Sequence, residues 1–189
     1  MLMIAKASVV LASFIILLLQ AAEPDTQSLK ERGFSIQKPP KKDEWQFKDK
    51  GKLTKSQMVL ANVVDDLSIE MYSEELESDK VNYDPKYTLE QNWKTISSDG
   101  QYKDVKMLGK ISNSTLPSRA ASGVKVWLLQ MTLKSPEGTP WEWKQYCFVG
   151  HENRSGFLLN IISNVGMQEK YKKDIDYILS TIKTFKVSK

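Results

Sequence analysis

Nucleophilic and acid–base chemistry has few candidates in this chain, which holds one histidine and one cysteine. His151 lies in the polar stretch 150–156, whose glycines suit a hairpin loop with a solvated side chain. No Gly-x-Ser-x-Gly turn is present, so a Ser-His-Asp hydrolase has no candidate nucleophile. Cys147 alternates with Tyr146 and Phe148 in a predicted strand, and buried thiols in such a setting are usually inert. We therefore predict no catalytic residues and a non-enzymatic protein.

Metal and cofactor chemistry has equally little support. A structural zinc site needs clustered Cys and His ligands, which one residue of each type cannot supply. The acidic residues that could hold calcium or manganese lack the spacing of a calcium loop, so solvated loop acids are the simpler interpretation; they are Asp65, Asp66, Glu74, Glu75, Glu77, Asp79 and Asp84. Whether segment 73–84 binds a divalent cation stays open. No glycine-rich loop joins a predicted strand to a helix, and we expect no cofactor.

Two groups of side chains could form an interaction surface. Lysines gather between residues 38 and 55, diluted by acids, and the candidates among them are Lys41, Lys42, Lys48 and Lys50. We favour a solvated basic edge that discourages strand-to-strand aggregation over a surface for anionic lipid or an acidic partner. Trp141 and Trp143 share one face of a predicted strand. They either anchor a partner or pack beneath a helix, and we favour packing.

The first half of the chain predicts short strands and one helix. Alternating or β-rich residues indicate two edge strands and a hairpin that turns at Asp65-Asp66, over residues 34–37, 45–47, 58–64 and 67–72. The run Thr88-Leu89-Glu90-Gln91 has the spacing of a capping box. The helix that it starts would place Leu89, Trp93 and Ile96 on one face and stop at 97–100.

The second half predicts four strands in an antiparallel meander, over residues 105–111, 124–133, 141–149 and 157–162. Both faces of 124–133 are partly apolar, so both are expected to be covered. In the closing segment, 167–185, apolar residues recur every three or four positions, as in an amphipathic helix laid across the sheet; they are Tyr171, Ile175, Ile178, Ile182 and Phe185. The fold class is therefore α+β, with a long C-terminal helix.

The N-terminus has the pattern of a secretory leader. Lys6 precedes an uncharged run from Ala7 to Ala22, and Glu23 ends it. We predict a signal peptide over 1–22, cleaved after Ala21 or Ala22, with an uncleaved anchor as the alternative, although a full span needs about 20 apolar residues. The protein would then be exported, to a periplasmic or extracellular location, or be held on a membrane by its leader.

Length, charge and cysteine count limit the domain organisation and the partners that the rest of the chain can have. The predicted layout is a short polar tether or single helical turn over 23–32, then one domain over 33–189. The formal net charge of +4 is too small to indicate a nucleic-acid partner. A single cysteine forbids an internal disulfide, so stability must come from the apolar core. The oligomeric state is open, and the sequons at Asn113 and Asn153 matter only in a eukaryotic pathway.

Both ends of this domain resemble the PsbP-like family. The residues that carry the resemblance are Gly33-Phe34-Ser35-Ile36 with Pro39, Pro40 and Trp45 behind them, and the ending from Asp176 to Val187. The resemblance spans roughly residues 33–187 and implies an antiparallel sheet sandwiched between helices. The same fold group includes an extrinsic lumenal subunit of photosystem II, a Ran-binding nuclear import factor and exported bacterial proteins of unknown role. A shared fold therefore implies no shared function.

The chain departs from the photosynthetic subunit in its plain secretory leader and in the short segment before Gly33. The nearest match in kind is thus an exported, non-photosynthetic relative. The leading hypothesis is a non-catalytic accessory or binding subunit of an envelope or membrane-associated assembly, whose partner is a protein or a membrane surface. The alternative is a small-ligand carrier or enzyme with a pocket between the sheet and the C-terminal helix, lined by Trp127, Tyr146 and Tyr171.

Overall fold

The computed structural model describes residues 25–40, 42–75, 83–116, 125–150 and 155–184. The larger of its two sheets has eight strands: β3 (Trp45–Lys48), β4 (Met58–Asn62), β5 (Leu67–Glu75), β6 (Lys103–Met107), β7 (Ser112–Ser114), β8 (Val126–Lys134), β9 (Pro140–Val149) and β10 (Ser155–Asn164). The smaller sheet has three: β1 (Thr26–Leu29), β2 (Phe34–Gln37) and β11 (Lys183–Thr184). The α-helices are α2 (Pro85–Ser98), α3 (Met167–Lys170) and α4 (Lys172–Thr181), and the 3-10 turns are η1 (Lys30–Arg32) and η2 (Lys42–Glu44).

All strand pairs of the larger sheet are antiparallel, in the order β3-β4-β5-β10-β9-β8-β6, with β7 also paired to β8. The predicted hairpin, now β4 and β5, and the predicted meander, now β6, β8, β9 and β10, are both confirmed. Their junction is the long pairing of β10 with β5, from Ser155 opposite Glu75 to Ser163 opposite Leu67. No local pattern marks this pairing, because it joins segments far apart in the chain.

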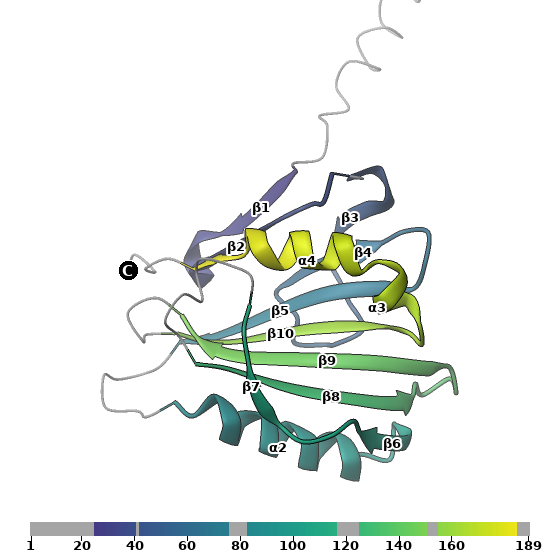
Figure 1. The fold of residues 1–189 in the computed structure, drawn as a ribbon. Helices are drawn as coiled ribbons and strands as arrows, with labels where there is room; N and C mark the ends of the chain where they lie inside the picture. Colours follow the sequence, from purple (N-terminus) through teal and green to yellow (C-terminus); the bar gives the residue numbers. More distant parts are fainter. Residues whose placement is uncertain (1–24, 41, 76–82, 117–124, 151–154, 185–189) are drawn as a thin grey trace, which may run out of the picture.

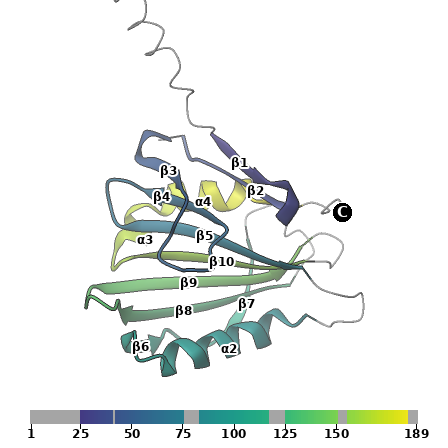
Figure 2. The ribbon, with the colours of Figure 1, turned by 180° about the vertical axis from the view of Figure 1, so that it is seen from behind.

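Helices cover the sheet from opposite sides, as the α+β expectation requires. Figures 1 and 2 show α2 along β8 and β6 at one end of the molecule, and α4 with the small sheet at the other. Alternation along the strands divides the apolar side chains between two cores. Residues such as Leu60, Ile69 and Leu159 pack against α4 and β2, whereas Leu129 and Met131 pack against α2. The expectation that both faces of the central strand are covered is confirmed.

Helix α2 begins one turn earlier than the sequence predicted. Asp84 is its N-cap, and the carboxylate accepts hydrogen bonds from the backbone N–H of Lys86 at 2.9 Å and of Tyr87 at 3.3 Å. Pro85 occupies the first turn, where its missing N–H costs nothing. The prediction that the helix starts at Thr88 was therefore wrong. The upstream pair Asp84-Pro85 starts the helix, because the Asp84 carboxylate accepts hydrogen bonds from the free N–H groups of the first turn. The predicted buried face is confirmed by Leu89 and Ile96.

The C-terminal helix is shorter than predicted, and it is broken. Tyr171 leaves the helical conformation between α3 and α4, and α4 ends at Thr181. Lys183 and Thr184 then pair with β2, so the segment that continued the apolar period is a strand. The amphipathic interpretation survives in α4, where Ile175, Ile178 and Leu179 are buried. Periodicity alone could not locate the end of the helix, because strand pairing with β2 competes with helix at the end of this segment.

The predicted tether contains a strand. Residues 26–29 form β1 and pair with β2 in antiparallel register, from Thr26 opposite Gln37 to Leu29 opposite Phe34. Only the short turn η1 that follows matches the sequence prediction. Leu29 is the single large apolar residue of the segment, so the sequence contains almost no strand pattern here. Pairing with β2 is what makes this segment a strand. The leader over 1–22 lies outside the described residues and stays a prediction, and none of the described helices is long and apolar enough to cross a bilayer.

Candidate functional site

A groove of about 940 Å³ opens on the α2 side of the larger sheet. Its floor is formed by β5, β9 and β10, one wall by α2, and the opposite wall by residues 52–56 of the loop between β3 and β4. We call it the α2 groove. Its volume falls within the range of ~300–1,000 Å³ that is usual for small-molecule sites.

Polar side chains converge on the floor of the α2 groove. The indole Nε1 of Trp143 donates to Oδ1 of Asn160 at 2.9 Å, and both side chains are buried. Gln145 is 2% exposed, and its Oε1 has no hydrogen-bond partner among the described residues. Nε1 of Trp141 likewise has no hydrogen-bond partner among the described residues. Buried polar atoms need partners, so the floor contains one acceptor and one donor that no described residue satisfies.

The loop wall is held by one buried carboxylate. Glu70 of β5 is 0% exposed and accepts hydrogen bonds from the backbone N–H of Lys52 at 2.7 Å and of Leu53 at 3.1 Å. Its oxygens also accept from the hydroxyls of Ser56 at 2.5 Å and Ser68 at 2.7 Å. Four donors compensate for removing this charge from water. Glu70 therefore fixes the loop, and with it one wall of the groove.

Gly51 lets this loop approach the carboxylate. A Cβ atom at residue 51 would lie 2.4 Å from Cδ and from Oε2 of Glu70. The clash would be with a carboxylate held by four hydrogen bonds, so the side chain cannot simply swing away. Glycine is required at this position by close packing, not by backbone conformation.

Lys52 connects the loop wall to the aromatic part of the floor. Its ammonium group lies 4.6 Å from the ring centroid of Trp141 and pairs with the carboxylate of Asp66. Tyr102 packs edge-to-face on Trp143, with ring centroids 6.1 Å apart. Burial, chiefly, raises the pKa of the Tyr102 hydroxyl, which therefore stays a neutral hydrogen-bonding group.

The charge of the lining differs from that of the whole protein. Four carboxylates line the groove, against two lysines; the acids are Asp66, Glu74, Asp99 and Glu137. One lysine, Lys52, is already paired with Asp66. A neutral or cationic group is thus better accommodated here than an anion.

Behind the α2 wall lies the single cysteine. Cys147 is 0% exposed, and its sulfur lies 3.3 Å from the Tyr83 hydroxyl. Burial raises the pKa of the Cys147 thiol to about 11, so the thiol is protonated at neutral pH. The side chain is a buried part of the packing beneath α2, as the sequence predicted.

The structure separates the predicted interaction residues. Trp141 and Trp143 both reach the groove, but Trp143 is 3% exposed and packs in the core beneath α2, as the favoured interpretation held. Lys48 and Lys50 are exposed and line no part of the groove. Lys41 and the side chain of Lys42 lie outside the described part of the structure. Of that lysine cluster, Lys52 and Lys55 are the ones that contribute to the groove.

Other predicted residues have local roles or cannot be placed. Asp65 accepts hydrogen bonds from Lys170 at 2.5 Å and from the Tyr171 hydroxyl at 2.7 Å, and Asp84 caps α2. In the described ranges, no three His, Cys, Asp or Glu side chains are grouped as a metal site would need. His151, Asn153, Glu77 and Asp79 lie outside those ranges.

The predicted lining of the alternative pocket is wrong. Tyr146 and Tyr171 belong to the core beneath α4, whereas Trp127 belongs to the core beneath α2, so the three cannot line one cavity. The groove lies on the α2 side instead. Its main positioning residue, Glu70, was not predicted from the sequence, although Ser68, Glu70 and Tyr72 form a polar stripe that alternates with the apolar residues of β5. That stripe is the signal that could have located the floor.

Fold and groove together define an α+β protein with an antiparallel sheet between helices and an open groove beside α2. No protein-family model matches the chain, and no curated protein matches it in sequence comparison. Solved structures do match. The solution structure of cyanobacterial PsbP (CyanoP) from Synechocystis sp. PCC 6803 aligns with a TM-score of 0.57 at 15% identity, over 88% of this chain and 95% of that one.

Two further structures agree. LpqN, described as involved in cell envelope biogenesis of Mycobacterium tuberculosis, aligns with a TM-score of 0.55 at 16% identity, over 82% of this chain and 86% of that one. A Bacteroides thetaiotaomicron protein aligns with a TM-score of 0.56 at 12% identity, over 87% of this chain but only 49% of its own length. The chain therefore has a PsbP-like fold, and the resemblance drawn from its sequence is confirmed at the level of fold.

Proposed function

We propose that the protein is an exported, non-catalytic binding protein that serves as an accessory subunit of an envelope-associated assembly, and that the α2 groove is its binding site. The observation that carries the proposal is the floor of the groove, where Gln145, which is buried, and Trp141, which is partly buried, each keep one buried polar atom without a partner among the described residues. Each such atom costs about 1–3 kcal/mol when left unsatisfied. A site that keeps two of them beside aromatic rings is suited to receiving a polar ligand group.

The solved structures of similar fold support an envelope location for this protein, but they do not identify its partner. LpqN is described as acting in cell envelope biogenesis, and CyanoP is a cyanobacterial PsbP. The predicted signal peptide agrees with an extracytoplasmic location. Because a fold hosts many functions, the partner must be identified by experiment.

The test purifies the tagged protein from its own compartment after mild crosslinking, and identifies companions by mass spectrometry. Thr95 is exposed on the groove wall, so Thr95→Trp would fill the groove without disturbing the core. Ser97, exposed on the same helix but not lining the groove, provides the control Ser97→Trp. We expect one enriched companion that Thr95→Trp loses and Ser97→Trp keeps. A companion retained by both variants would place the binding site elsewhere.

A second candidate function, a small-ligand carrier, is favoured by the size of the groove, which suits a small molecule. In that case the protein would purify without a companion protein but with a bound compound. Denaturing the purified protein and analysing the supernatant by mass spectrometry would release that compound from the parent and from Ser97→Trp, but not from Thr95→Trp. Release of the same compound from all three would exclude the groove as its site.

A further inference from the structure

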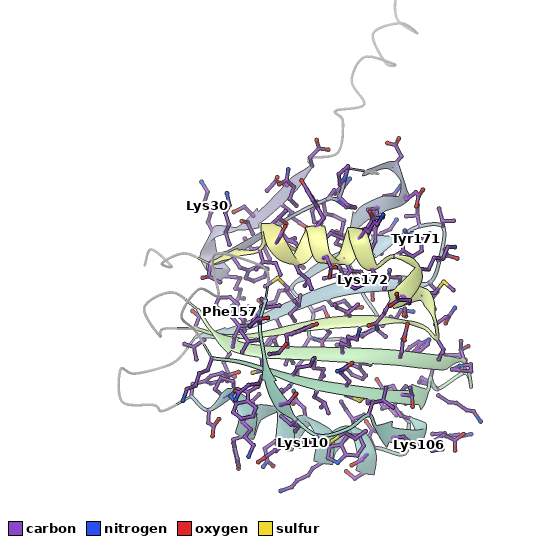
Figure 3. The ribbon with its side chains drawn as sticks, viewed as in Figure 1. Lys30, Lys106, Lys110, Phe157, Tyr171 and Lys172 are labelled. Atoms are coloured by element: carbon purple, nitrogen blue, oxygen red, sulfur yellow. The ribbon has the colours of Figure 1, made fainter. Side chains whose placement is uncertain are left out.

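A second surface, on the other side of α2 from the groove, is rich in lysine. Its six lysines form two groups, which we together call the lysine face: Lys86, Lys94 and Lys110 line a shallow hollow beside α2, and Lys103, Lys106 and Lys134 lie near Asp104 of β6. The groove contacts a different stripe of α2, which includes Thr88, Asn92 and Thr95. Figure 3 shows Lys106 and Lys110 at the α2 end of the molecule, far from Lys30 at the other end.

Positive charge on the lysine face is only partly compensated. Lys86 pairs with Glu90 at 3.2 Å and Lys134 with Asp104 at 2.6 Å. Within the described chain, the other four lysines make no ion pair. The hydrogen bond from Lys134 lowers the pKa of the Asp104 carboxyl, and the charges of nearby lysines lower it further. The field over this face is therefore positive.

An exposed aliphatic side chain projects among these lysines. Leu108 is 51% exposed, at the turn that follows β6 and between Lys106 and Lys110. Gly109 has a φ of 81°, a conformation that glycine adopts without strain, and it turns the chain directly after Leu108, whose backbone N–H donates to the Gln130 carbonyl at 2.9 Å. Beside the turn is a shallow hollow of about 420 Å³ with Trp93, Met107 and Ile111 among its lining residues.

We propose that the lysine face docks on the surface of an anionic phospholipid membrane, with the lysines against lipid phosphates and Leu108 at the boundary of the acyl chains. Basic clusters near a membrane are attracted to anionic headgroups, and an adjacent apolar side chain adds shallow insertion. Lysines that only protect an edge strand would explain Lys103 and Lys106 on β6. They would not explain Lys94 on α2 or the exposed Leu108.

Docking in this way leaves other surfaces free. The α2 groove lies on a different side of the helix, so a membrane-bound molecule could still bind a partner there. Strand β1, which the predicted leader precedes, lies at the opposite end of the molecule (Figure 1). The lysine face therefore makes a membrane contact that is independent of the leader and of the proposed groove function.

The experiment measures co-sedimentation of the full chain with vesicles of phosphatidylcholine alone and with vesicles that also contain phosphatidylglycerol. The leader carries one charged residue, Lys6, so the diagnostic quantity is the ratio of anionic to neutral binding. We expect tighter binding to the anionic vesicles, weakened by added salt. Equal binding to both vesicle types would overturn the proposal.

Variants locate the contact. The triple variant Lys94→Gln, Lys106→Gln and Lys110→Gln should weaken binding to anionic vesicles by roughly 100-fold, since each lysine near the surface contributes about fivefold. The matched control carries the same change at Lys30, Lys48 and Lys50, all exposed and away from the lysine face, and should bind like the parent. Loss in the control and retention in the test variant would instead assign binding to the surface that carries Lys30, Lys48 and Lys50, and the proposal would fail.

A single apolar substitution separates lipid from an acidic protein as the partner. Leu108→Ser leaves every charge unchanged and should reduce binding to anionic vesicles by severalfold, because it removes the inserted side chain. The same variant should bind polyglutamate as well as the parent does. If Leu108→Ser has no effect on vesicle binding while the triple variant loses affinity for both vesicles and polyglutamate, the lysine face is a surface for acidic protein and the lipid proposal fails. Circular dichroism of each variant confirms folding.

Discussion

The carboxylate of Glu70 offers the sharpest test of how the α2 groove is built. Glu70→Gln keeps the size of the side chain and exchanges one acceptor oxygen for a donor. The oxygen Oε2 accepts from Leu53 N–H and from the Ser56 hydroxyl, whereas Oε1 accepts from Lys52 N–H and the Ser68 hydroxyl. Whichever way the amide is turned, one buried backbone N–H of the loop then faces another donor.

The expected cost follows from these bonds. A hydrogen bond to a charged group contributes about 1.5–3 kcal/mol, and the serine hydroxyl can rotate to accept from the new amide. We therefore expect Glu70→Gln to lower the free energy of unfolding by about 2–4 kcal/mol, which is a large part of the ~5–15 kcal/mol available to a domain. The matched control is Glu74→Gln, an exposed carboxylate on the same face of β5, which should change stability by less than about 0.5 kcal/mol.

Urea denaturation followed by tryptophan fluorescence measures both values, and amide hydrogen exchange reports on the loop. The amides of Lys52 and Leu53 should lose protection in Glu70→Gln and keep it in Glu74→Gln. If Glu70→Gln were as stable as the control and its loop amides exchanged at the parent rate, Glu70 would not hold the groove wall.

Three further outcomes follow from single contacts. Gly51→Ala should destabilise the parent by about 1–3 kcal/mol in urea denaturation but cost little in a Glu70→Ala background, because its methyl group clashes with that carboxylate; equal costs in both would contradict the contact. Lys170 and then Tyr171 lower the pKa of the Asp65 carboxyl below its usual 3.8, so Asp65 stabilises the fold above pH 3.8 and this contribution is lost as pH falls through the folded-state pKa. Lys170→Met should raise that pKa, measured by NMR, and an unchanged value would refute the pairing. The buried Cys147 thiol, with a pKa of about 11, should react with Ellman's reagent at pH 8 far more slowly in the native protein than in urea, and equal rates would show it to be accessible.

Local sequence patterns predicted the elements whose structure is determined by residues close together in the chain. The hairpin around Asp65, the meander and the buried face of α2 all follow from alternation or from a 3.6-residue period. Strand β1 escaped prediction because its order comes from pairing with β2, and the end of α4 escaped prediction because Lys183 and Thr184 pair with the same strand. These determinants are distant in sequence and become visible only in the fold.

The candidate site was harder to foresee for the same reason. Trp141 and Trp143 were correctly placed on one strand face, but their neighbours in the groove come from β5, β10, α2 and the loop of residues 52–56. The pocket was assigned to the C-terminal helix because that segment had the clearest amphipathic period. Helix α4 covers a cluster of buried apolar residues, whereas α2 leaves part of its sheet face open.

The claim that the α2 groove binds a partner is tested most directly by photo-crosslinking in the native compartment. A photoreactive residue replaces Thr95 on the groove wall and, in the control protein, Ser180, which is exposed on α4. We predict a specific covalent adduct from position 95 and none from position 180, with the adduct lost when excess unlabelled parent protein competes. An adduct from position 180 alone, or the same products from both positions, would contradict the assignment of the groove as the binding site.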